Sequence, residues 1–138
     1  MTAARRIDAD SKPAMEPAST ILLGRGDVAA ALDMDACIAA IEEALRAQAD
    51  GATIGPDVLA AHVEGGGFHV KAAGLRRPTT RYAVKINANF PDNPRAHGLP
   101  TIQGVVALFD GANGRLLALM DSGEITALRT GADRKSVV

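Results

Sequence analysis

The amino-acid sequence predicts an α+β domain in which a curved, mostly antiparallel sheet carries a packed N-terminal helix. The first observation is that residues 98–132 combine a strand, a tight Gly-Asn turn, a second strand and the start of a helix. The second is that the strand-like segments before it follow one another with short Gly-rich turns. The third is that residues 33–51 contain the clearest helical periodicity in the chain.

The chain is expected to begin with a tail and two short elements. Residues 1–19 are rich in Ala, Pro, Ser and charge and have no periodicity, so we expect a disordered tail. Thr20–Gly24 is a short predicted strand. Asp27 can cap a brief helical turn that ends near Leu32.

The main helix has both a start and a stop signal. Asp33 suits its N-cap position, and Gly51 suits a left-handed residue at its C-terminal end. The apolar residues that share one side are Met34, Ile38, Ile41, Ala44 and Leu45. Cys37 lies on this helix, and we interpret it as a small core residue rather than a nucleophile. As the single cysteine, it cannot form an internal disulfide.

Three strands are predicted in the middle of the chain. The segment Ile54–Pro56 is expected to break the chain before the first of them, Asp57–Val63. In Phe68–Ala73, the alternation places His69 and Lys71 on one face. In Arg81–Asn87, it places Ala83, Lys85 and Asn87 on one face. Asn89–His97 contains two prolines and is predicted to be a loop.

A hairpin and a helix start follow. The strand Gln103–Asp110 is apolar at nearly every residue, which predicts that both of its faces are covered. The turn residues are Gly111, Asn113 and Gly114. The return strand is Leu116–Met120, and Asp121 and Ser122 then precede a helix with Glu124 in its first turn.

Composition excludes several classes of protein. The net charge of -1 and the 3% aromatic content argue against a nucleic-acid binder. No apolar run approaches the ~20 residues of a membrane span, and the N-terminus does not resemble a secretory signal. We therefore expect a cytoplasmic protein. The residues His62, His69 and His97 lack metal-ligand spacing, so no metal site is predicted.

Two cations are candidates for chemistry. Lys85 lies in an otherwise apolar strand, so its ammonium group must reach water, form a pair or bind a ligand. A lysine at a sheet edge that points to water remains the alternative. Arg129 is expected in the first turns of the last helix, where a cation opposes the helix dipole. Its planar fork suits a carboxylate.

Three segments carry a resemblance to a known family. They are YAVKINANFPDNP, HGLPTIQGVVALFD and GRLLALMDSGEITALRTGA. They resemble the ornithine cyclodeaminase/mu-crystallin family, and the similarity runs from about Ile21 to Ala132. The resemblance implies a substrate-binding and dimerisation domain over residues 20–132, whose sheet forms a homodimer interface. It also implies NAD or NADP as the cofactor of the full-length enzymes, and a small amino or imino acid as the substrate.

The resemblance also assigns roles to residues. It implies that Lys85, in a strand with Asn87, binds the substrate carboxylate or assists proton transfer, so that Lys85 is the expected catalytic residue. It implies that Arg129 contacts both substrate and cofactor. It places cofactor contacts at Thr101 and Thr130, although a strand-entry threonine and a plain helix threonine remain open alternatives.

Lys71 is expected to replace a missing charge. Many members of the family carry an arginine in a Pro-x-Arg context that grips the substrate carboxylate. Here the corresponding region, Gly55–Leu59, contains no arginine. Lys71 could supply the positive charge from the same sheet face. This departure argues against ornithine as the substrate.

The family's dinucleotide-binding domain has no counterpart in this sequence. No Gly-x-Gly-x-x-Gly run lies between a predicted strand and helix. Residues 133–138 depart from the Ala-rich helix that the resemblance leads us to expect. We therefore expect a truncated chain: the substrate-binding part of a deaminase or dehydrogenase that removes hydride from Cα, forms an imine and releases ammonia. Such a chain would be inactive alone and would bind no cofactor stably. The alternatives are a non-catalytic, mu-crystallin-like ligand-binding or oligomerisation module, and an unrelated α+β scaffold.

Overall fold

A computed structural model describes residues 19–136 and confirms the α+β class. The predicted tail, residues 1–19, lies outside the described part of the chain except for Ser19. The strands are β1 (Ile21–Leu23), β2 (Thr53–Val63), β3 (Gly66–Leu75), β4 (Arg81–Asn89), β5 (Ile102–Asp110) and β6 (Leu116–Asp121). The helices are α1 (Arg25–Ala31), α2 (Met34–Ala49), α3 (Asn93–His97) and α4 (Ser122–Ser136).

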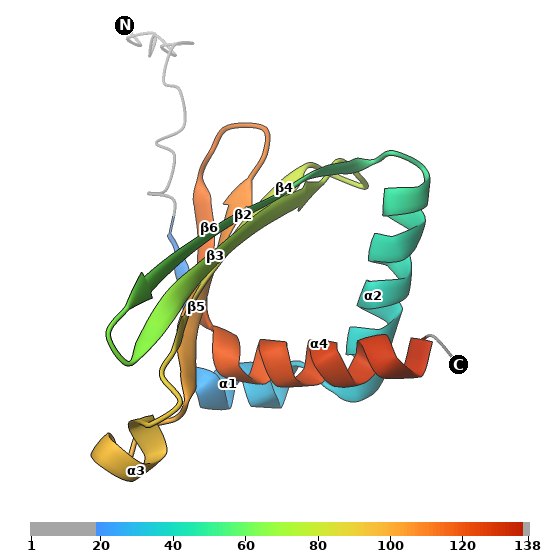
Figure 1. Cartoon of the computed structure of the whole chain (residues 1–138). Helices are drawn as coiled ribbons and strands as arrows, with labels where there is room; N and C mark the ends of the chain where they lie inside the picture. The colour runs from blue at the N-terminus through green and yellow to red at the C-terminus, as the bar shows by residue number, and fades with distance from the viewer. Residues whose placement is uncertain (1–18, 137–138) are drawn as a thin grey trace, which may run out of the picture.

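The six strands form one curved sheet in the order β1-β6-β5-β4-β3-β2 (Figure 1). Strands β2 to β6 are joined by antiparallel pairing, as the sequence predicts, while β1 pairs with β6 in parallel. Since the chain passes from β2 to β6 through consecutive neighbours, short turns suffice for most of these connections. The two ends of the sheet do not pair with each other, so the sheet is open.

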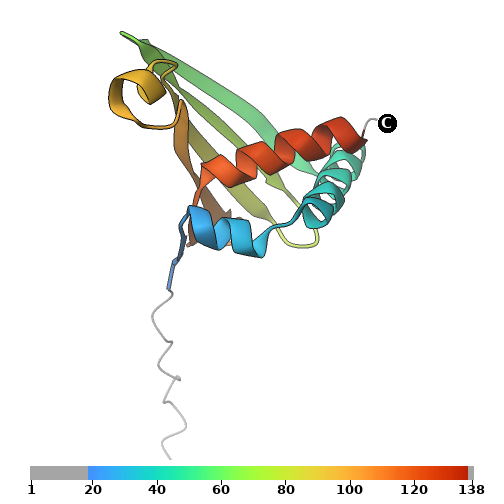
Figure 2. The same ribbon diagram turned by 90° about the horizontal axis from the view of Figure 1, so that it is seen from below.

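Helix α4 lies along one face of this sheet and contacts β4 and β5 (Figure 2). Helix α2 has its main contacts with α4, whereas the sequence predicted that it would pack directly on the sheet. Its predicted ends are confirmed: Asp33 accepts a 2.8 Å hydrogen bond from the Ala36 amide, and Gly51 has a φ of 68°. Cys37 and Ala47 are its buried residues, which agrees with the interpretation of Cys37 as a small core residue.

The predicted chain break at residues 54–56 is wrong. Strand β2 runs continuously from Thr53, and the disturbance is a shift of register between Ile54 and Asp57. Gly55 has a φ of 81°, and Pro56 lacks an amide hydrogen to donate. These residues therefore produce a bulge within the strand instead of ending it.

The predicted loop at residues 89–97 also needs correction. Strand β4 extends to Asn89, and residues Asn93–His97 form the short helix α3. Pro94 suits the first turn because its fixed φ is already helical, and Gly98 closes the helix with a φ of 64°. Pro94, which indicates a loop in the sequence, thus helps to start α3, and Gly98 ends it.

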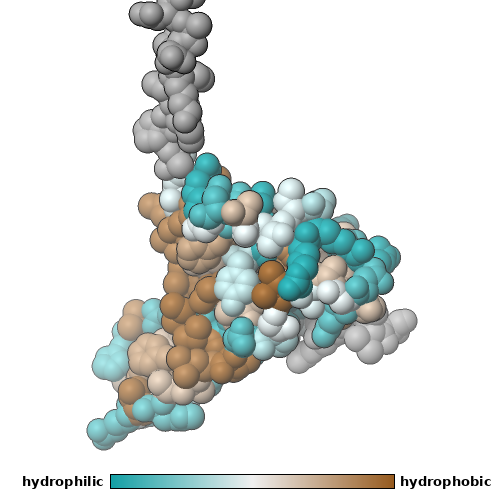
Figure 3. All heavy atoms as spheres, turned by 90° about the horizontal axis from the view of Figure 1, so that it is seen from above, coloured by the Kyte–Doolittle hydropathy of each residue, from teal (hydrophilic) through white to brown (hydrophobic). Residues whose placement is uncertain are grey.

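The face of the sheet turned away from the helices is apolar and open. Its cross-strand neighbours include Leu59 with Val70, and Val70 with Ile86. Leu59 is 66% exposed, Ile86 is 42% exposed and Phe68 is 41% exposed. Figure 3 shows hydrophobic residues gathered in a band on this face. The prediction that both faces of β5 are covered is wrong for residues 19–136: α4 contacts this strand on one face, and every β5 residue except the buried Val106 is half-buried or exposed.

Candidate functional site

Register brings two lysines together on the helix-covered face of the sheet. Lys71 of β3 and Lys85 of β4 are direct cross-strand partners. On the neighbouring strand β2, Val58 stands opposite Lys71. Like charges in directly opposed positions destabilise a sheet. This arrangement is therefore costly to the fold and is explained better by binding than by stability.

Helix α4 adds a third cation above the two lysines. Arg129 lines a pocket of about 220 Å³ together with Lys71, Lys85 and Asn87. The four residues predicted to bind substrate thus share one hollow, which is built from β3, β4 and α4. Arg129 lies in the middle of α4 and not in its first turns, so the argument from the helix dipole does not apply to it.

The electrostatics of the pocket favour an anion. Among the side chains of residues 19–132, five other arginines form ion pairs, but Lys71, Lys85 and Arg129 have no carboxylate within ion-pair distance. Burial lowers the pKa of Lys85, and the charges of Arg129 and Lys71 lower it further. A bound carboxylate would relieve this repulsion, because it would place an opposite charge among the three cations.

Asn87 is held in a fixed orientation. Its Oδ1 accepts a 2.7 Å hydrogen bond from the hydroxyl of Ser122, the first residue of α4, which is fully buried. With its oxygen occupied in this way, the amide NH₂ of Asn87 is the group left to donate to a ligand. The hydrogen bond also ties the start of α4 to the sheet next to Lys85.

One functional candidate, Thr126, was not identified from the sequence. It lines the same pocket one helical turn before Arg129. Its Oγ1 is buried and has no hydrogen-bond partner within the described residues. Since a buried hydroxyl without a partner costs free energy, this atom is a further polar group that a ligand could satisfy. The spacing of three residues from Arg129 is the signal that could have revealed it. The remaining lining residues are His69, Asn89 and Ile102.

The two predicted cofactor threonines lie outside this pocket. The Thr130 hydroxyl donates a 2.8 Å hydrogen bond to the Thr126 carbonyl oxygen, one turn earlier in α4. That is the plain helix threonine which the sequence left open as an alternative. Thr101 precedes β5, and its carbonyl oxygen accepts a 2.8 Å bond from the Phe90 amide. Neither threonine lines the pocket, so their proposed contacts stay predictions.

Neither a metal cluster nor a membrane-spanning helix is found in the described part of the chain. Among the side chains of residues 19–132, no three of His, Cys, Asp or Glu gather closely enough to hold a metal ion. None of the helices in this part of the chain has the length and apolar character needed to cross a membrane.

Comparison with known proteins gives the site a context. The profile of the Ornithine cyclodeaminase/mu-crystallin family matches residues 18–136. The chain belongs to this family. It is 30% identical over 132 residues to Delta(1)-pyrroline-2-carboxylate reductase 2 of Burkholderia ambifaria, with 96% of the chain and 37% of that protein covered. It is 34% identical over 114 residues to alanine dehydrogenase of Archaeoglobus fulgidus, with 82% and 34% covered.

Solved structures share the fold of this family member. The Thermococcus litoralis Delta(1)-pyrroline-2-carboxylate reductase, in complex with NADH and L-proline, matches with a TM-score of 0.78 and 31% identity. That match covers 83% of the chain and 36% of the reductase. An archaeal alanine dehydrogenase dimer with bound NAD matches with a TM-score of 0.77 and 32% identity, covering 83% and 34%. The chain therefore spans about a third of the length of these relatives, which are dehydrogenase- and reductase-type enzymes.

Proposed function

We propose that this chain is the substrate-binding part of an NAD(P)-dependent enzyme that oxidises, deaminates or reduces a small amino or imino acid. The observation that carries the proposal is the convergence of Lys71, Lys85 and Arg129, from three different elements, on one pocket. None of the three has an acidic partner among the side chains of residues 19–132. The carboxylate of the substrate is the anion that would pair with them.

Each residue of the pocket has a different role in binding the acid. Arg129 offers a planar fork to the carboxylate, and Lys71 supplies the charge that the family's missing arginine would carry. Asn87 and Thr126 add hydrogen bonds that fix the orientation of the acid. Lys85, whose pKa is lowered, can hold or release a proton beside the reacting carbon more readily than an ordinary lysine.

The nicotinamide cofactor would supply a hydride acceptor or donor. The strand-to-helix turn between β1 and α1 contains Gly24 and Gly26 but no third glycine in register, and Asp27 Oδ2 already accepts a 2.9 Å hydrogen bond from the Gly24 amide. The residues present would therefore contact only the nicotinamide end, through Arg129 and, as the resemblance implies, Thr101 and Thr130. For this reason we expect the chain, assayed alone, to bind its substrate acid without converting it.

The test combines ligand binding with turnover. We expect NMR titration of the chain with L-alanine, L-proline and Delta(1)-pyrroline-2-carboxylate to shift the amide signals of residues around Lys85 and Arg129. We expect no oxidation of NADH by the chain alone, and turnover when it is joined to the dinucleotide-binding part of a reductase relative. Binding without turnover in that fusion would favour a non-catalytic binding module, and an absence of binding by every acid would contradict the proposal.

The open face of the sheet suggests a second part of the proposal, that the chain forms a homodimer. A contiguous apolar face with residues such as Leu59 and Ile86 at its surface is a common mark of an interface. A second copy of the same sheet would cover it through a symmetric contact.

Two neighbouring residues provide a matched test of this dimer. Leu59 is 66% exposed on the outer face, and Val58 is 64% exposed on the opposite face. Because Leu59→Lys would bury a charge in the interface, we expect it to weaken the dimer about tenfold or more, as measured by sedimentation equilibrium. Val58→Lys should leave the dimer constant unchanged. An equal effect of both variants, or a monomeric parent chain, would contradict the homodimer.

A further inference from the structure

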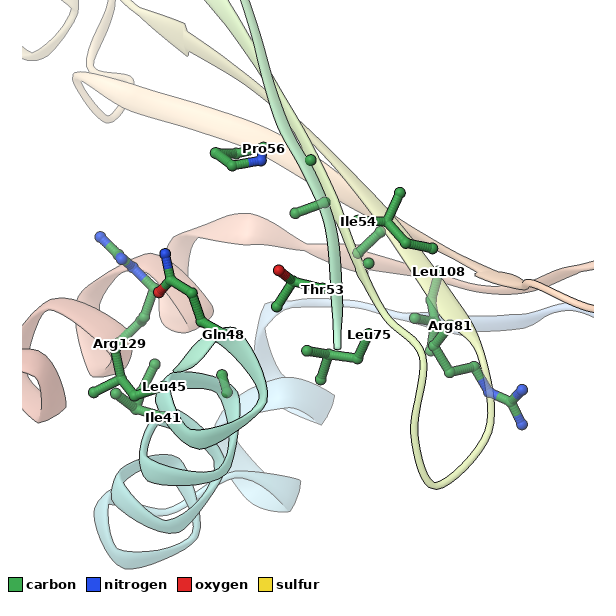
Figure 4. A pocket seen from close by; sticks show the side chains of 15 residues that line it. Ile41, Leu45, Gln48, Thr53, Ile54, Pro56, Leu75, Arg81, Leu108 and Arg129 are labelled. Carbon is green, nitrogen blue, oxygen red and sulfur yellow. The ribbon is translucent and has the colours of Figure 1, made fainter. Parts of the chain in front are cut away.

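A second, larger hollow lies beside the cationic pocket. It has a volume of about 510 Å³, lies between α2 and the strands, and is open to solvent on one side. Figure 4 shows Ile41 and Leu45 of α2 on one side of it, with Leu75 and Leu108 of the strands across from them. Leu45 is 48% exposed although it belongs to the apolar stripe of its helix. An apolar stripe left open in this way has room for an apolar ligand group.

The floor of this hollow continues into the cationic pocket. Ala73 and Ala83 are cross-strand partners on β3 and β4, and both line the larger hollow. They lie two residues from Lys71 and Lys85 on the same face of the sheet, because side chains alternate along a strand. Because each alanine side chain is only a methyl group, these residues do not block the passage between the two hollows. Arg129 lines both hollows and therefore stands at their junction.

We infer that the apolar hollow receives the side chain of the acid whose carboxylate is held by Lys85 and Arg129. The inference rests on the proposed function and narrows its substrate class to amino or imino acids with a hydrocarbon side chain or ring. Diamino acids are disfavoured, because the lining residues within 19–132 include no carboxylate to pair with a second ammonium group. The cations at the junction would also repel that group.

Simple acids can test this without any cofactor. Dissociation constants for acetate, butyrate and hexanoate are measured on the whole chain by NMR titration or calorimetry. Burial of the tail should tighten binding roughly threefold to fourfold for each buried methylene. The comparison ligand is 5-aminopentanoate, which has a tail as long as that of hexanoate but ends in an ammonium group. We expect it to bind at least about tenfold more weakly than hexanoate.

Substitutions of residues that line the hollow then test where the hydrocarbon tail of the acid binds. Leu45→Ser removes apolar surface from α2, and Ala83→Phe fills the passage from the strand side. Each should lower the ratio of hexanoate affinity to acetate affinity about fivefold or more. Val84→Phe places the same bulk on the opposite face of β4 and should leave this ratio unchanged. If Ala83→Phe does not fold, Leu45→Ser decides by itself.

The possible failures are distinguishable. Equal affinities for acetate and hexanoate would overturn the inference while leaving the carboxylate site intact. They would mean that the hydrocarbon tail does not reach the hollow, or that another part of the polypeptide occupies it. The inference also fails if the ratio survives in the Leu45→Ser variant, or if 5-aminopentanoate binds as tightly as hexanoate. An absence of binding by every acid would instead reject the proposed function itself.

Discussion

Lys85→Met is expected to weaken binding of a carboxylic acid about 30-fold or more, which is the usual cost of removing one partner from a partly buried charge pair. The same change should raise the free energy of unfolding of the free protein. It removes a half-buried ammonium group and separates the direct Lys71–Lys85 pair, whose repulsion costs roughly 0.2–1 kcal/mol in a sheet. Methionine retains the length and apolar stem of lysine. A substitution that stabilises the fold and weakens binding is the signature of a functional residue.

The pH dependence of these effects follows from the lowered pKa of Lys85. Burial is the largest cause, followed by the charges of Arg129 and Lys71, and the ordinary lysine pKa is 10.5. Below the lowered pKa, Lys85 is charged in both the folded and the unfolded chain, and the folded state is destabilised by the full free-energy cost of burying this charge beside two cations. Between the lowered pKa and 10.5, the unfolded chain binds more protons, so the stability of the parent protein rises with pH. The stabilising effect of Lys85→Met should therefore be complete below the lowered pKa and shrink across this window.

Binding should show the opposite trend with pH. As pH rises through the lowered pKa, Lys85 loses the charge that holds the acid, so affinity falls in the parent protein but not in the Lys85→Met variant. Arg95→Met is the matched control, since Arg95 is an exposed cation on α3 with a single 3.4 Å ion pair to Asp92. It changes the net charge equally and should alter acid binding less than about twofold. Equal losses in the two variants would show that only net charge matters and that Lys85 has no specific role.

The sequence allows the faces of the strands to be predicted but not their register. Alternation places His69 and Lys71 on one face of their strand, and Lys85 and Asn87 on one face of theirs. That Lys71 stands opposite Lys85 depends on the length of the turn at residues 76–80 and on the pairing of β3 with β4. Periodicity carries no information about such pairing. The resemblance to a family supplied the expectation that these residues meet, and the geometry shows them in one pocket.

The parts that sequence reasoning missed depend on packing over long distances. The partner of α2 is α4 rather than the sheet, because the chain returns through α4 only after all six strands are laid down. The apolar hollow is a consequence of this arrangement and has no local signature. The buried hydroxyl of Thr126 is likewise invisible until α4 is placed over β4. By contrast, the hairpin and the ends of α2 are set by local turn and cap residues and were predicted correctly.

Gly104→Ala is expected to destabilise the protein by about 2 kcal/mol or more, because the new methyl group has no space. Gly104 of β5 is the cross-strand partner of Asn87. A Cβ at this position would overlap the carbonyl oxygen of Ile86 and the Oδ1 of Asn87, and would lie 2.8 Å from the Oγ of Ser122. None of these atoms can easily move away: the Ile86 oxygen belongs to the backbone, and the side chains of Asn87 and Ser122 are hydrogen-bonded to each other.

This glycine sets the distance between the first turn of α4 and the sheet, so its effect should reach the binding pocket. If the methyl group pushes Ser122 outward, Thr126 and Arg129 move away from Lys85, and acid affinity should fall together with stability. Urea denaturation and NMR titration measure the two effects on the same sample. Gly26→Ala in α1 is the matched control: no atom lies within 4 Å of its added Cβ, and we expect between no change and a gain of about 1 kcal/mol. If Gly104→Ala instead matches the stability of the parent protein, then α4 does not approach the sheet as closely as described, and the meeting of Arg129 with the two lysines loses its structural basis.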